Sequence, residues 1–146
     1  MKRENEESLD YVDGRKYLDD EPFTGVGYFL DEEGRLEAEA TYQDGIQWGL
    51  RRAWYDTGKL LHEYAMFRGV FHGKKREWHR NGKLAEEADY EFGHDLHHRR
   101  WDEDGNLIEE YHIDKNSPGY KDLEKYREAY KDELDEIKRK AQELPE

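Results

Sequence analysis

Gly82-Lys83-Leu84-Ala85-Glu86-Glu87 is one of four copies of a short motif, and the repetition of this motif decides the fold. The glycines that open the four copies lie 24, 24 and 23 residues apart (58 − 34, 82 − 58 and 105 − 82). Two further glycine series keep the 24-residue step, and in one of them His97 takes the place of a fourth glycine. Self-similarity at a fixed short period indicates a repeat array, which presents an extended surface and therefore favours binding over catalysis. The other copies are Gly34-Arg35-Leu36-Glu37-Ala38-Glu39, Gly58-Lys59-Leu60-Leu61-His62-Glu63 and Gly105-Asn106-Leu107-Ile108-Glu109-Glu110, and the further series are Gly45, Gly69, Gly93 and Gly25, Gly49, Gly73.

Composition indicates one folded domain with a small apolar core. A chain of 146 residues suits a single domain, and an apolar content of 34% is low for that size. Eleven Tyr, four Trp and five Phe are nevertheless too many for a disordered chain, even with 42% charged residues. Cysteine is absent, which excludes disulfides, thiolate nucleophiles and Cys-based zinc sites. No stretch approaches the roughly 18 apolar residues of a membrane span, so we expect a cytoplasmic protein.

The net charge of −13 points toward a basic partner. Residues 1–24 carry 8 acids against 4 bases, residues 25–113 carry 19 against 12, and residues 114–146 carry 10 against 8. Proteins that bind nucleic acid or anionic membranes show clustered Lys and Arg instead, so we expect neither partner. The alternative is that the negative charge only keeps an aromatic-rich sheet soluble.

Each period is predicted to form a β-hairpin. Asn81-Gly82 and Asp104-Gly105 are signals for two-residue type I′ turns, and weaker forms stand at Gly34 and Gly58. This turn would place Arg76 opposite Glu87 and Trp78 opposite Ala85. Opposite charges paired across strands contribute roughly 0.2–1 kcal/mol each and therefore favour this register. The predicted ladder consists of Arg52–Glu63, Arg76–Glu87 and Arg99–Glu110, with Tyr28 opposite Glu39.

The predicted register divides the sheet into two faces. One face carries the charge ladder with an aromatic column, and the other carries a leucine column with several tyrosines. The leucine and tyrosine face resembles a core more closely. The ladder face would hold Leu30, Trp54, Trp78, Trp101, Leu61 and Ile108, and the other Leu36, Leu60, Leu84, Leu107, Phe29, Tyr42, Tyr55, Met66, Tyr90 and Tyr111.

The two ends of the chain differ from the array. Apolar residues spaced three or four apart follow Ser117-Pro118 and predict one amphipathic helix over residues 118–143, with Leu123, Tyr130, Leu134 and Ile137 buried. This helix could lie across the sheet or project as a docking arm. Residues 11–17 resemble an incomplete hairpin around Asp13-Gly14. The predicted organisation is a mainly β protein with a leader (1–24), about four stacked hairpins in a single-layer antiparallel meander (25–113) and a C-terminal helical segment (114–146).

The repeat unit resembles the MORN-repeat variant. The features that carry this resemblance are a Gly-opened strand, the turn Arg80-Asn81-Gly82-Lys83-Leu84, a Glu three positions after the Leu, and a Tyr before a glycine turn as in Tyr42-Gln43-Asp44-Gly45. The lead-in Pro22-Phe23-Thr24-Gly25 is similar to that of bacterial MORN-type antitoxin or immunity proteins. The resemblance covers about residues 11–113, and it implies a cytoplasmic antidote that binds and silences a toxin. Trp at 54, 78 and 101, His97 in the glycine place, and the helical tail depart from the family pattern.

Chemistry-bearing clusters are weak in this sequence. His94-Asp95-Leu96-His97-His98 could be read as a metal site, but the sequence offers no further ligands at a suitable spacing, and a solvated hairpin connection is the simpler interpretation. Carboxylate pairs need an enclosed pocket for acid–base work, and an open meander offers none. We therefore expect no enzyme activity, cofactor or metal.

Repetition separates residues that build the scaffold from residues that confer specificity. Types that recur at one repeat position are assigned to stacking, and exposed types that vary between repeats are assigned to partner binding, together with the Trp column. The leading hypothesis is an antitoxin that occludes a basic toxin through an acidic aromatic face, and the alternative is a scaffold or adaptor that assembles partners through the sheet and the helix. The structural ladder is Glu39, Glu63, Glu87, Glu110, Arg52, Arg76 and Arg99, and the partner-binding residues are Trp54, Phe67, Trp78, Asp89, Glu91, His94, His97, His98 and Trp101.

Overall fold

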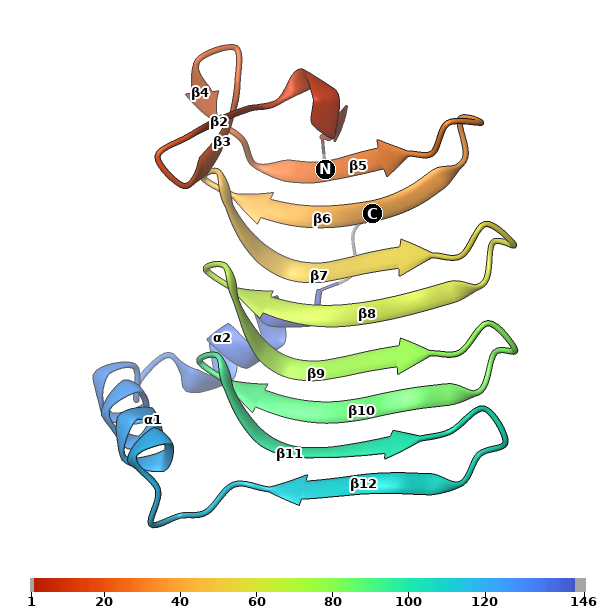
Figure 1. Ribbon diagram of the computed structural model, residues 1–146. Helices are drawn as coiled ribbons and strands as arrows, with labels where there is room; N and C mark the ends of the chain where they lie inside the picture. Colours follow the sequence, from red (N-terminus) through yellow and green to blue (C-terminus); the bar gives the residue numbers. More distant parts are fainter. Residues whose placement is uncertain (1, 144–146) are drawn as a thin grey trace.

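The computed structural model describes residues 2–143 and shows one long antiparallel meander with two helices behind it (Figure 1). Eight consecutive strands form four hairpins, which confirms the predicted fold class. A ninth strand, β1 (Arg3–Asn5), pairs in parallel with β5 at the N-terminal edge and was not predicted. The meander consists of β5 (Gly25–Leu30), β6 (Leu36–Gln43), β7 (Ile46–Trp54), β8 (Leu60–Phe67), β9 (Val70–Trp78), β10 (Leu84–Glu91), β11 (His94–Trp101) and β12 (Leu107–His112).

The turns at the four repeated glycines are longer than the predicted two-residue turns. The His79 N–H donates to the Lys83 carbonyl at 2.9 Å, and the Gly82 N–H donates to the His79 carbonyl at 2.9 Å. Gly82 has a φ of +87°, a left-handed conformation that glycine adopts without a steric penalty. A three-residue hairpin loop closed by a left-handed glycine is the result. Gly34, Gly58 and Gly105 close the same loop, with φ of +80°, +84° and +90°.

Two-residue turns with positive φ at both positions occur instead at the opposite end of the sheet. They are Asp44-Gly45, Arg68-Gly69 and Phe92-Gly93, with φ of 47° to 51° at the first residue and 80° to 83° at the glycine. This is the pattern of type I′ turns. The sequence therefore carried the correct turn type, but we assigned it to the wrong glycine series.

The longer turn brings the leucine column onto the face that carries the ladder and the aromatic column. Trp78 pairs with Leu84 rather than Ala85, and an extra residue in β10 then restores the pairing of Arg76 with Glu87. Directly opposed residues share one face of a sheet, so the predicted separation of Trp and Leu is wrong, whereas the ladder pairs are confirmed. The further Trp and Leu pairs are Leu30–Leu36, Trp54–Leu60 and Trp101–Leu107, and the ladder pairs are Tyr28–Glu39, Arg52–Glu63 and Arg99–Glu110. We call the face that carries the charge ladder, the Trp column and the leucine column the ladder face, and the opposite face the reverse face.

The C-terminal segment forms two helices rather than the single predicted helix. They are α1 (Pro118–Ala129), which begins where the Ser117 hydroxyl accepts from the Tyr120 N–H at 3.2 Å, and α2 (Leu134–Ala141). Leu123 and Ile137 are both buried in one cluster with Phe67 and Phe92. In a straight helix those two residues would lie about 21 Å apart, at 1.5 Å per residue. The break at residues 130–133 therefore lets both reach the same cluster.

The helices cover one end of the ladder face, not the leucine and tyrosine face that we expected to form the core. Predicted burial is confirmed for Leu123 and Ile137, while Tyr130 and Leu134 are partly buried against the same cluster. A second cluster joins Ala141 of α2 to Leu50 and Ala65 of the sheet. Residues 144–146, which belong to the predicted helical segment, lie outside the described residues.

The leader folds into the predicted hairpin and adds a third strand. β2 (Asp10–Val12), β3 (Arg15–Leu18) and β4 (Glu21–Pro22) form a small sheet above the array, joined to β1 by the 3₁₀ helix η1 (Glu6–Ser8) (Figure 1). Its apolar residues Leu9 and Phe23 pack with Ala40 and Tyr42 in a cluster separate from the one under the helices. The leader thereby covers the N-terminal end of the array, while nothing covers β12 in the part of the chain that the structure describes.

Candidate protein-binding surface

The charge ladder crosses the whole sheet on the ladder face. Arg and Glu alternate from strand to strand, with ion pairs Arg52–Glu39 at 2.7 Å, Arg76–Glu87 at 3.1 Å and Arg99–Glu110 at 3.4 Å. Arg76 also lies 4.0 Å from Glu63. The exposed pairs of this kind contribute little individually, but the row neutralises its own charge and fixes the register.

Arg3 completes the ladder at its N-terminal end. β5 carries Tyr28 where the other first strands of the hairpins carry Arg. The Arg3 guanidinium of β1 lies 5.7 Å from the Tyr28 ring centroid and 3.1 Å from the Glu39 carboxylate. Glu39 is only 3% exposed and sits between Arg3 and Arg52. The buried carboxylate is therefore paired on both sides, by a residue that the sequence analysis missed.

An acidic hollow opens at the turn end of the first two hairpins. It is a shallow pocket of about 400 Å³ in which Leu36, Trp54 and Tyr55 supply the apolar wall. Five carboxylates and two guanidinium groups surround them, which gives a formal charge of −3. The charged residues are Asp31, Glu32, Glu33, Glu37 and Asp56 with Arg35 and Arg80.

Two of the carboxylates in the acidic hollow are held in their ionised form. The Arg35 backbone N–H and then its guanidinium donate to Asp31 and lower the pKa of that carboxyl. A hydrogen bond at 2.9 Å from Arg80 does the same for the pKa of Asp56. Glu32 and Glu37 form no ion pair within residues 2–143, so their charges are available to a ligand.

Of the predicted partner-binding residues, the Trp column lies on the open part of the ladder face. Trp54, Trp78 and Trp101 are each half-buried, next to the three-residue turns and away from the helices. Trp54 lines the acidic hollow, with Arg52 at 5.5 Å from its ring centroid.

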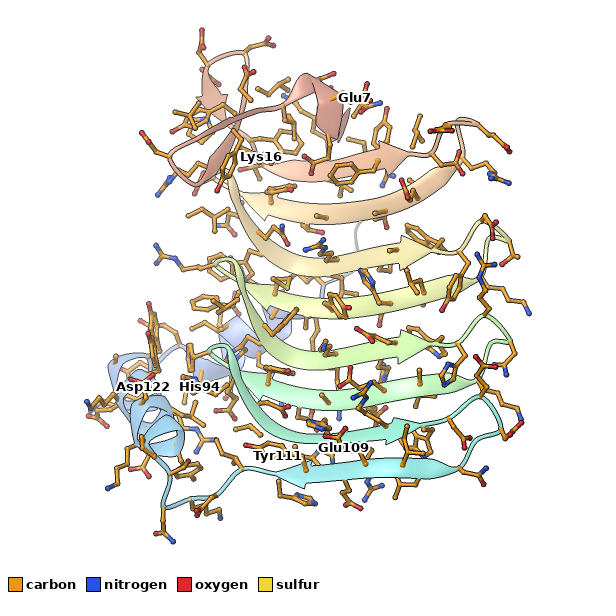
Figure 2. The ribbon with its side chains drawn as sticks, in the orientation of Figure 1. Glu7, Lys16, His94, Glu109, Tyr111 and Asp122 are labelled. Carbon is orange, nitrogen blue, oxygen red and sulfur yellow. The ribbon has the colours of Figure 1, made fainter. Side chains whose placement is uncertain are left out.

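Three predicted partner-binding residues already have partners in the helical segment. Phe67 is 5% exposed and lies in the cluster beneath the helices. Glu91 pairs with Arg127 of α1 at 2.6 Å, and His94 lies 3.0 Å from Asp122, as labelled in Figure 2. A charge reversal at Glu91 would therefore loosen α1, which removes it as a test of partner binding alone.

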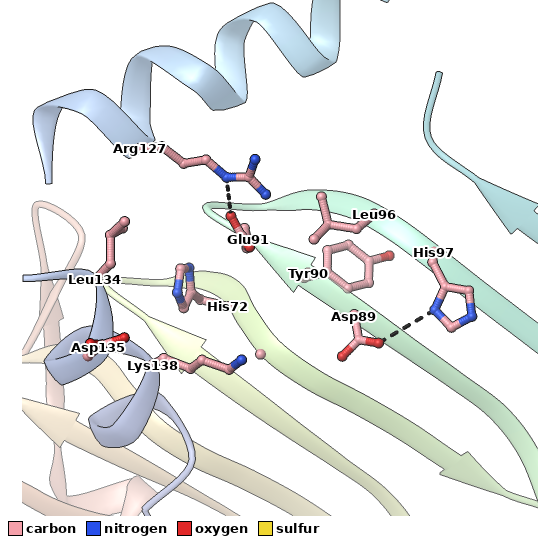
Figure 3. Close-up of a pocket in the computed structure, with 11 residues that line it drawn as sticks. His72, Asp89, Tyr90, Glu91, Leu96, His97, Arg127, Leu134, Asp135 and Lys138 are labelled. Atoms are coloured by element: carbon pink, nitrogen blue, oxygen red, sulfur yellow. Dashed lines mark hydrogen bonds and ion pairs between the residues drawn. The ribbon is translucent and has the colours of Figure 1, made fainter. Parts of the chain in front are cut away.

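Asp89 and His97 line a second pocket, of about 620 Å³, between the helices and the ladder face (Figure 3). Asp89 lies 3.5 Å from His97 and 2.9 Å from Lys74, so its charge is already compensated. Arg127 and Lys138 from the two helices face the same space. Asp89, Glu91 and Asp135 against Arg127 and Lys138 give the lining a formal charge of −1, so this pocket is less acidic than the hollow.

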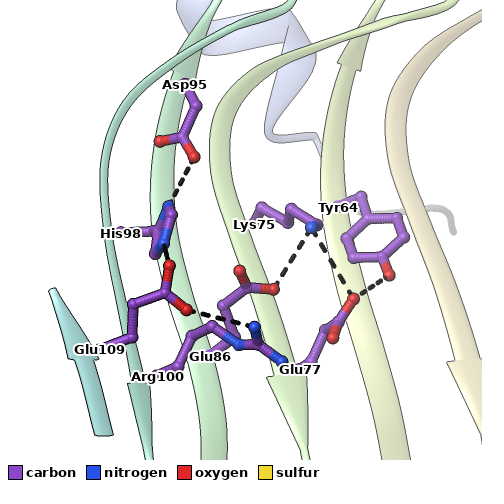
Figure 4. Close-up of polar contacts among 8 residues, drawn as sticks. All are labelled: Tyr64, Lys75, Glu77, Glu86, Asp95, His98, Arg100 and Glu109. Carbon is purple, nitrogen blue, oxygen red and sulfur yellow. Dashed lines mark hydrogen bonds and ion pairs between the residues drawn. The ribbon is translucent and has the colours of Figure 1, made fainter. Parts of the chain in front are cut away.

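His98, the last of the predicted partner-binding residues, lies on the reverse face in a separate polar network (Figure 4). Its two nitrogens lie 2.6 Å from Asp95 and 2.9 Å from Glu109. Desolvation lowers the pKa of His98, but the hydrogen bonds to these two carboxylates raise it overall. His98 is thereby separated by the thickness of the sheet from the residues with which the sequence analysis grouped it.

A second polar network on the reverse face is centred on Lys75. Its ammonium lies 3.3 Å from Glu86 and about equally far, 5.4 to 5.8 Å, from the ring centroids of three aromatic residues. The Tyr64 hydroxyl donates to Glu77, and burial with this bond raises the pKa of Tyr64 far above its usual value. Burial and Asp95 raise the pKa of Tyr90 to about 12. Each of these polar groups has a partner within the chain, so we interpret the network as structural.

The histidines of residues 94–98 are not brought together as a metal site in the described residues. Within residues 2–143, no group of three His, Cys, Asp or Glu side chains is placed to hold a metal ion. His94, His97 and His98 lie in strand β11, not in the loop that we expected, and each points to a different partner. No helix in the same range has the length and apolar character needed to cross a membrane.

The comparison with family models matches residues 71–91 to the MORN repeat variant. These residues comprise most of β9, the turn at Gly82, and β10, which is one hairpin of the array. No curated protein and no solved structure matches the chain. The match supports a MORN-repeat protein, and MORN repeats suggest a repeat-based scaffold for protein binding.

Proposed function

We propose that this protein is an antitoxin that binds a basic toxin through the acidic hollow and the Trp column, and that it neutralises the toxin by covering its active site. The observation that carries the proposal is the hollow itself, which five carboxylates line together with the half-buried Trp54. Aromatic residues are enriched among the residues that dominate binding energy at protein interfaces.

A Lys or Arg side chain fits the chemistry of this hollow. A cation over an indole ring gains about 0.5–1 kcal/mol at an exposed site and about 2 kcal/mol when water is excluded. Glu32 and Glu37 add charge that no described residue neutralises. An excess of negative charge also accelerates encounter with a basic partner, in a manner that falls with ionic strength.

The identification of the partner as a toxin rests on the resemblance to MORN-type antitoxins. Many toxins act on nucleic acids, and an acidic face can occupy the phosphate-binding site of such an enzyme. The protein then needs no chemistry of its own, in agreement with a surface built from turns and a repeated ladder.

The test uses the product of the adjacent gene as the candidate toxin. Glu32→Lys with Glu37→Lys should lower the association rate at least tenfold at low salt and remove growth protection on co-expression. The matched control is Glu103→Lys with Asp104→Lys, which makes the same charge change in the exposed fourth turn, away from the hollow. Equal losses in both double variants would mean that total charge acts rather than the hollow.

A scaffold that assembles several partners is the second candidate, favoured by the repeat match. In that role the sheet would be the binding element, because α1 and α2 bury Leu123, Ile137 and Ala141 against the same chain. Two results would together favour the scaffold over the antitoxin. The adjacent gene product would bind this protein and still arrest growth on co-expression, and the isolated complexes would contain a third component.

A further inference from the structure

The last strand of the array, β12, has an open edge. Every residue of β12 is exposed, with Leu107 at 51% and Ile108 at 62%, and no described residue pairs with its outer side (Figure 1). The Ile113 N–H donates to the Leu96 carbonyl, so by the alternation of strand backbones the peptide groups of Glu110 and His112 point outward. A row of unpaired donors and acceptors of this kind is a template for another strand.

The sequence of β12 repeats that of an interior strand whose neighbour is known. Leu107-Ile108-Glu109-Glu110 corresponds to Leu84-Ala85-Glu86-Glu87 of β10. In the sheet, β11 follows β10 and places two adjacent arginines against this pair, with Arg99 opposite Glu87 and Arg100 opposite Glu86. No strand of the described chain does the same for Glu109 and Glu110 on their outer side.

The ladder shows the same incomplete step. Glu39, Glu63 and Glu87 each lie between two cationic elements of the sheet, since Arg3, Arg52, Arg76 and Arg99 alternate with them. The ladder begins at a cation, Arg3, and ends at an anion, Glu110. Glu110 has Arg99 on one side only. A hydrogen bond from His112 lowers the pKa of its carboxyl most, and the charge of Arg99 lowers it further. It is ionised and faces an unoccupied strand position.

A second copy of this chain is a poor occupant of that position. Directly opposed residues share one face and one hydrogen-bonding side, so antiparallel pairing of two β12 strands near their centre places Glu109 opposite Glu109, or Glu110 opposite Glu110, of the other copy. Like charges directly opposed across strands are destabilising. The edge therefore selects against self-association and in favour of a basic strand.

We propose that β12 is a docking edge for an extended segment of a partner protein that carries two adjacent arginines, one directed to each face of the sheet. The segment adds a strand to the array, pairs its arginines with Glu109 and Glu110, and covers Leu107 and Ile108. Backbone bonds supply affinity in this mode of recognition, and the alternating side chains supply specificity. The proposal does not depend on the acidic hollow, which lies at the other end of the sheet.

The chain itself provides the probe for the test. A capped synthetic peptide of residues 94–101 reproduces the strand that follows β10, including Arg99 and Arg100. Added to the full-length protein, it should shift the amide resonances of Glu110 and His112 and slow their hydrogen exchange. His112→Pro removes an outward N–H near the end of the strand and should abolish the effect at the Glu110 amide.

A charge exchange makes the assignment specific. Glu110→Lys should weaken binding of the peptide at least tenfold, and a peptide with Glu in place of Arg99 should bind this variant better than it binds the wild type. Glu7→Lys is the matched control, an exposed acid of η1 with the same charge change at the opposite end of the array and outside the acidic hollow, and it should bind the peptide as the wild type does.

The proposal is overturned by any of three results. The first is no shift at Glu110 and His112 up to millimolar peptide. The second is binding that Glu110→Lys and Glu7→Lys weaken equally. The third is a concentration-dependent dimer of the free protein that His112→Pro dissociates, because the occupant would then be a second copy. Failure of the antitoxin assay would leave each of these measurements unaffected.

Discussion

Phe92 should show an inverted preference between alanine and glycine. It is the first residue of a type I′ turn with a φ of +47°, a conformation that a bulky residue seldom adopts. Its ring is 6% exposed. It stacks on Tyr126 of α1, with ring centroids 5.4 Å apart, and on Tyr130, the C-cap of that helix, with centroids 5.3 Å apart. Its N–H donates to the His72 imidazole at 2.9 Å. The packing of the ring thus holds a strained backbone in place.

The magnitude follows from two opposing terms. Removing a buried Phe ring costs about 3–5 kcal/mol, so Phe92→Ala should lower the free energy of unfolding by that amount. A left-handed conformation costs a residue with a Cβ roughly 1–2 kcal/mol, which glycine avoids. Phe92→Gly should therefore be more stable than Phe92→Ala by about 1 kcal/mol, the reverse of the order in regular helices and strands. The loss in Phe92→Ala corresponds to a fall of roughly 6–20 °C in Tm for a chain of this size.

Urea denaturation followed by Trp fluorescence measures both variants. Arg68 is the matched control, because it occupies the same turn position with the same φ of +47° but is exposed. Arg68→Gly should be as stable as the wild type or more stable by up to about 1 kcal/mol. A Phe92→Ala variant as stable as the glycine variant, or a loss below about 1 kcal/mol in both, would refute the argument that the ring holds the strained turn.

Three further outcomes are expected. Gly82→Val forces a β-branched residue into a φ of +87° and should lower the free energy of unfolding by more than about 1 kcal/mol, whereas no change in the urea midpoint would contradict the turn assignment. Truncation after Pro118 should expose the aromatic cluster under the helices and lower Tm, and an unchanged thermal melt would show that the helices are dispensable. His62 is neutral in the folded state, because desolvation and then the charge of Arg51 lower its pKa to about 4. Since the unfolded state binds the proton from about pH 6.5 downward, the stability that neutral His62 provides is lost as the pH falls from about 6.5 to 4. His62→Gln should flatten the dependence of the free energy of unfolding on pH in that window. A dependence identical to that of the wild type would remove His62 as the cause.

Much of the array could be predicted because its determinants are close in sequence. The pairing of Arg76 with Glu87 depends on one turn and on eleven residues of chain, and the same arrangement recurs in each hairpin. The partner of Trp78 was predicted incorrectly for an equally local reason. Asn81-Gly82 fits a two-residue turn and a three-residue turn, and the extra residue in β10 returns the ladder to the same register in both cases.

The candidate site was less predictable because it depends on variation rather than repetition. Trp54 was identified from its recurrence, but four of the five carboxylates around it come from Asp31-Glu32-Glu33 and Asp56, which stand in turns of adjacent hairpins. The acidic first turn, compared with Arg80-Asn81 in the third, was the signal that could have indicated the hollow. Asp89, Glu91 and His94 were assigned to a partner because sequence alone did not show that Lys74, Arg127 and Asp122 already contact them.

The sequence by itself determined the 24-residue period, the four hairpins, the charge ladder and the amphipathic character of the tail, because each depends on turn residues and side-chain alternation within a few tens of residues. Only the tertiary structure decided which face the tail covers, where its helix breaks and how the ladder begins. Arg3 and Glu39 are 36 residues apart, as are Glu91 and Arg127, and their contacts depend on the pairing of β1 with β5 and on the placement of α1 against the sheet. A local pattern specifies which residues share a face, but burial of that face depends on the shape that all the strands make together.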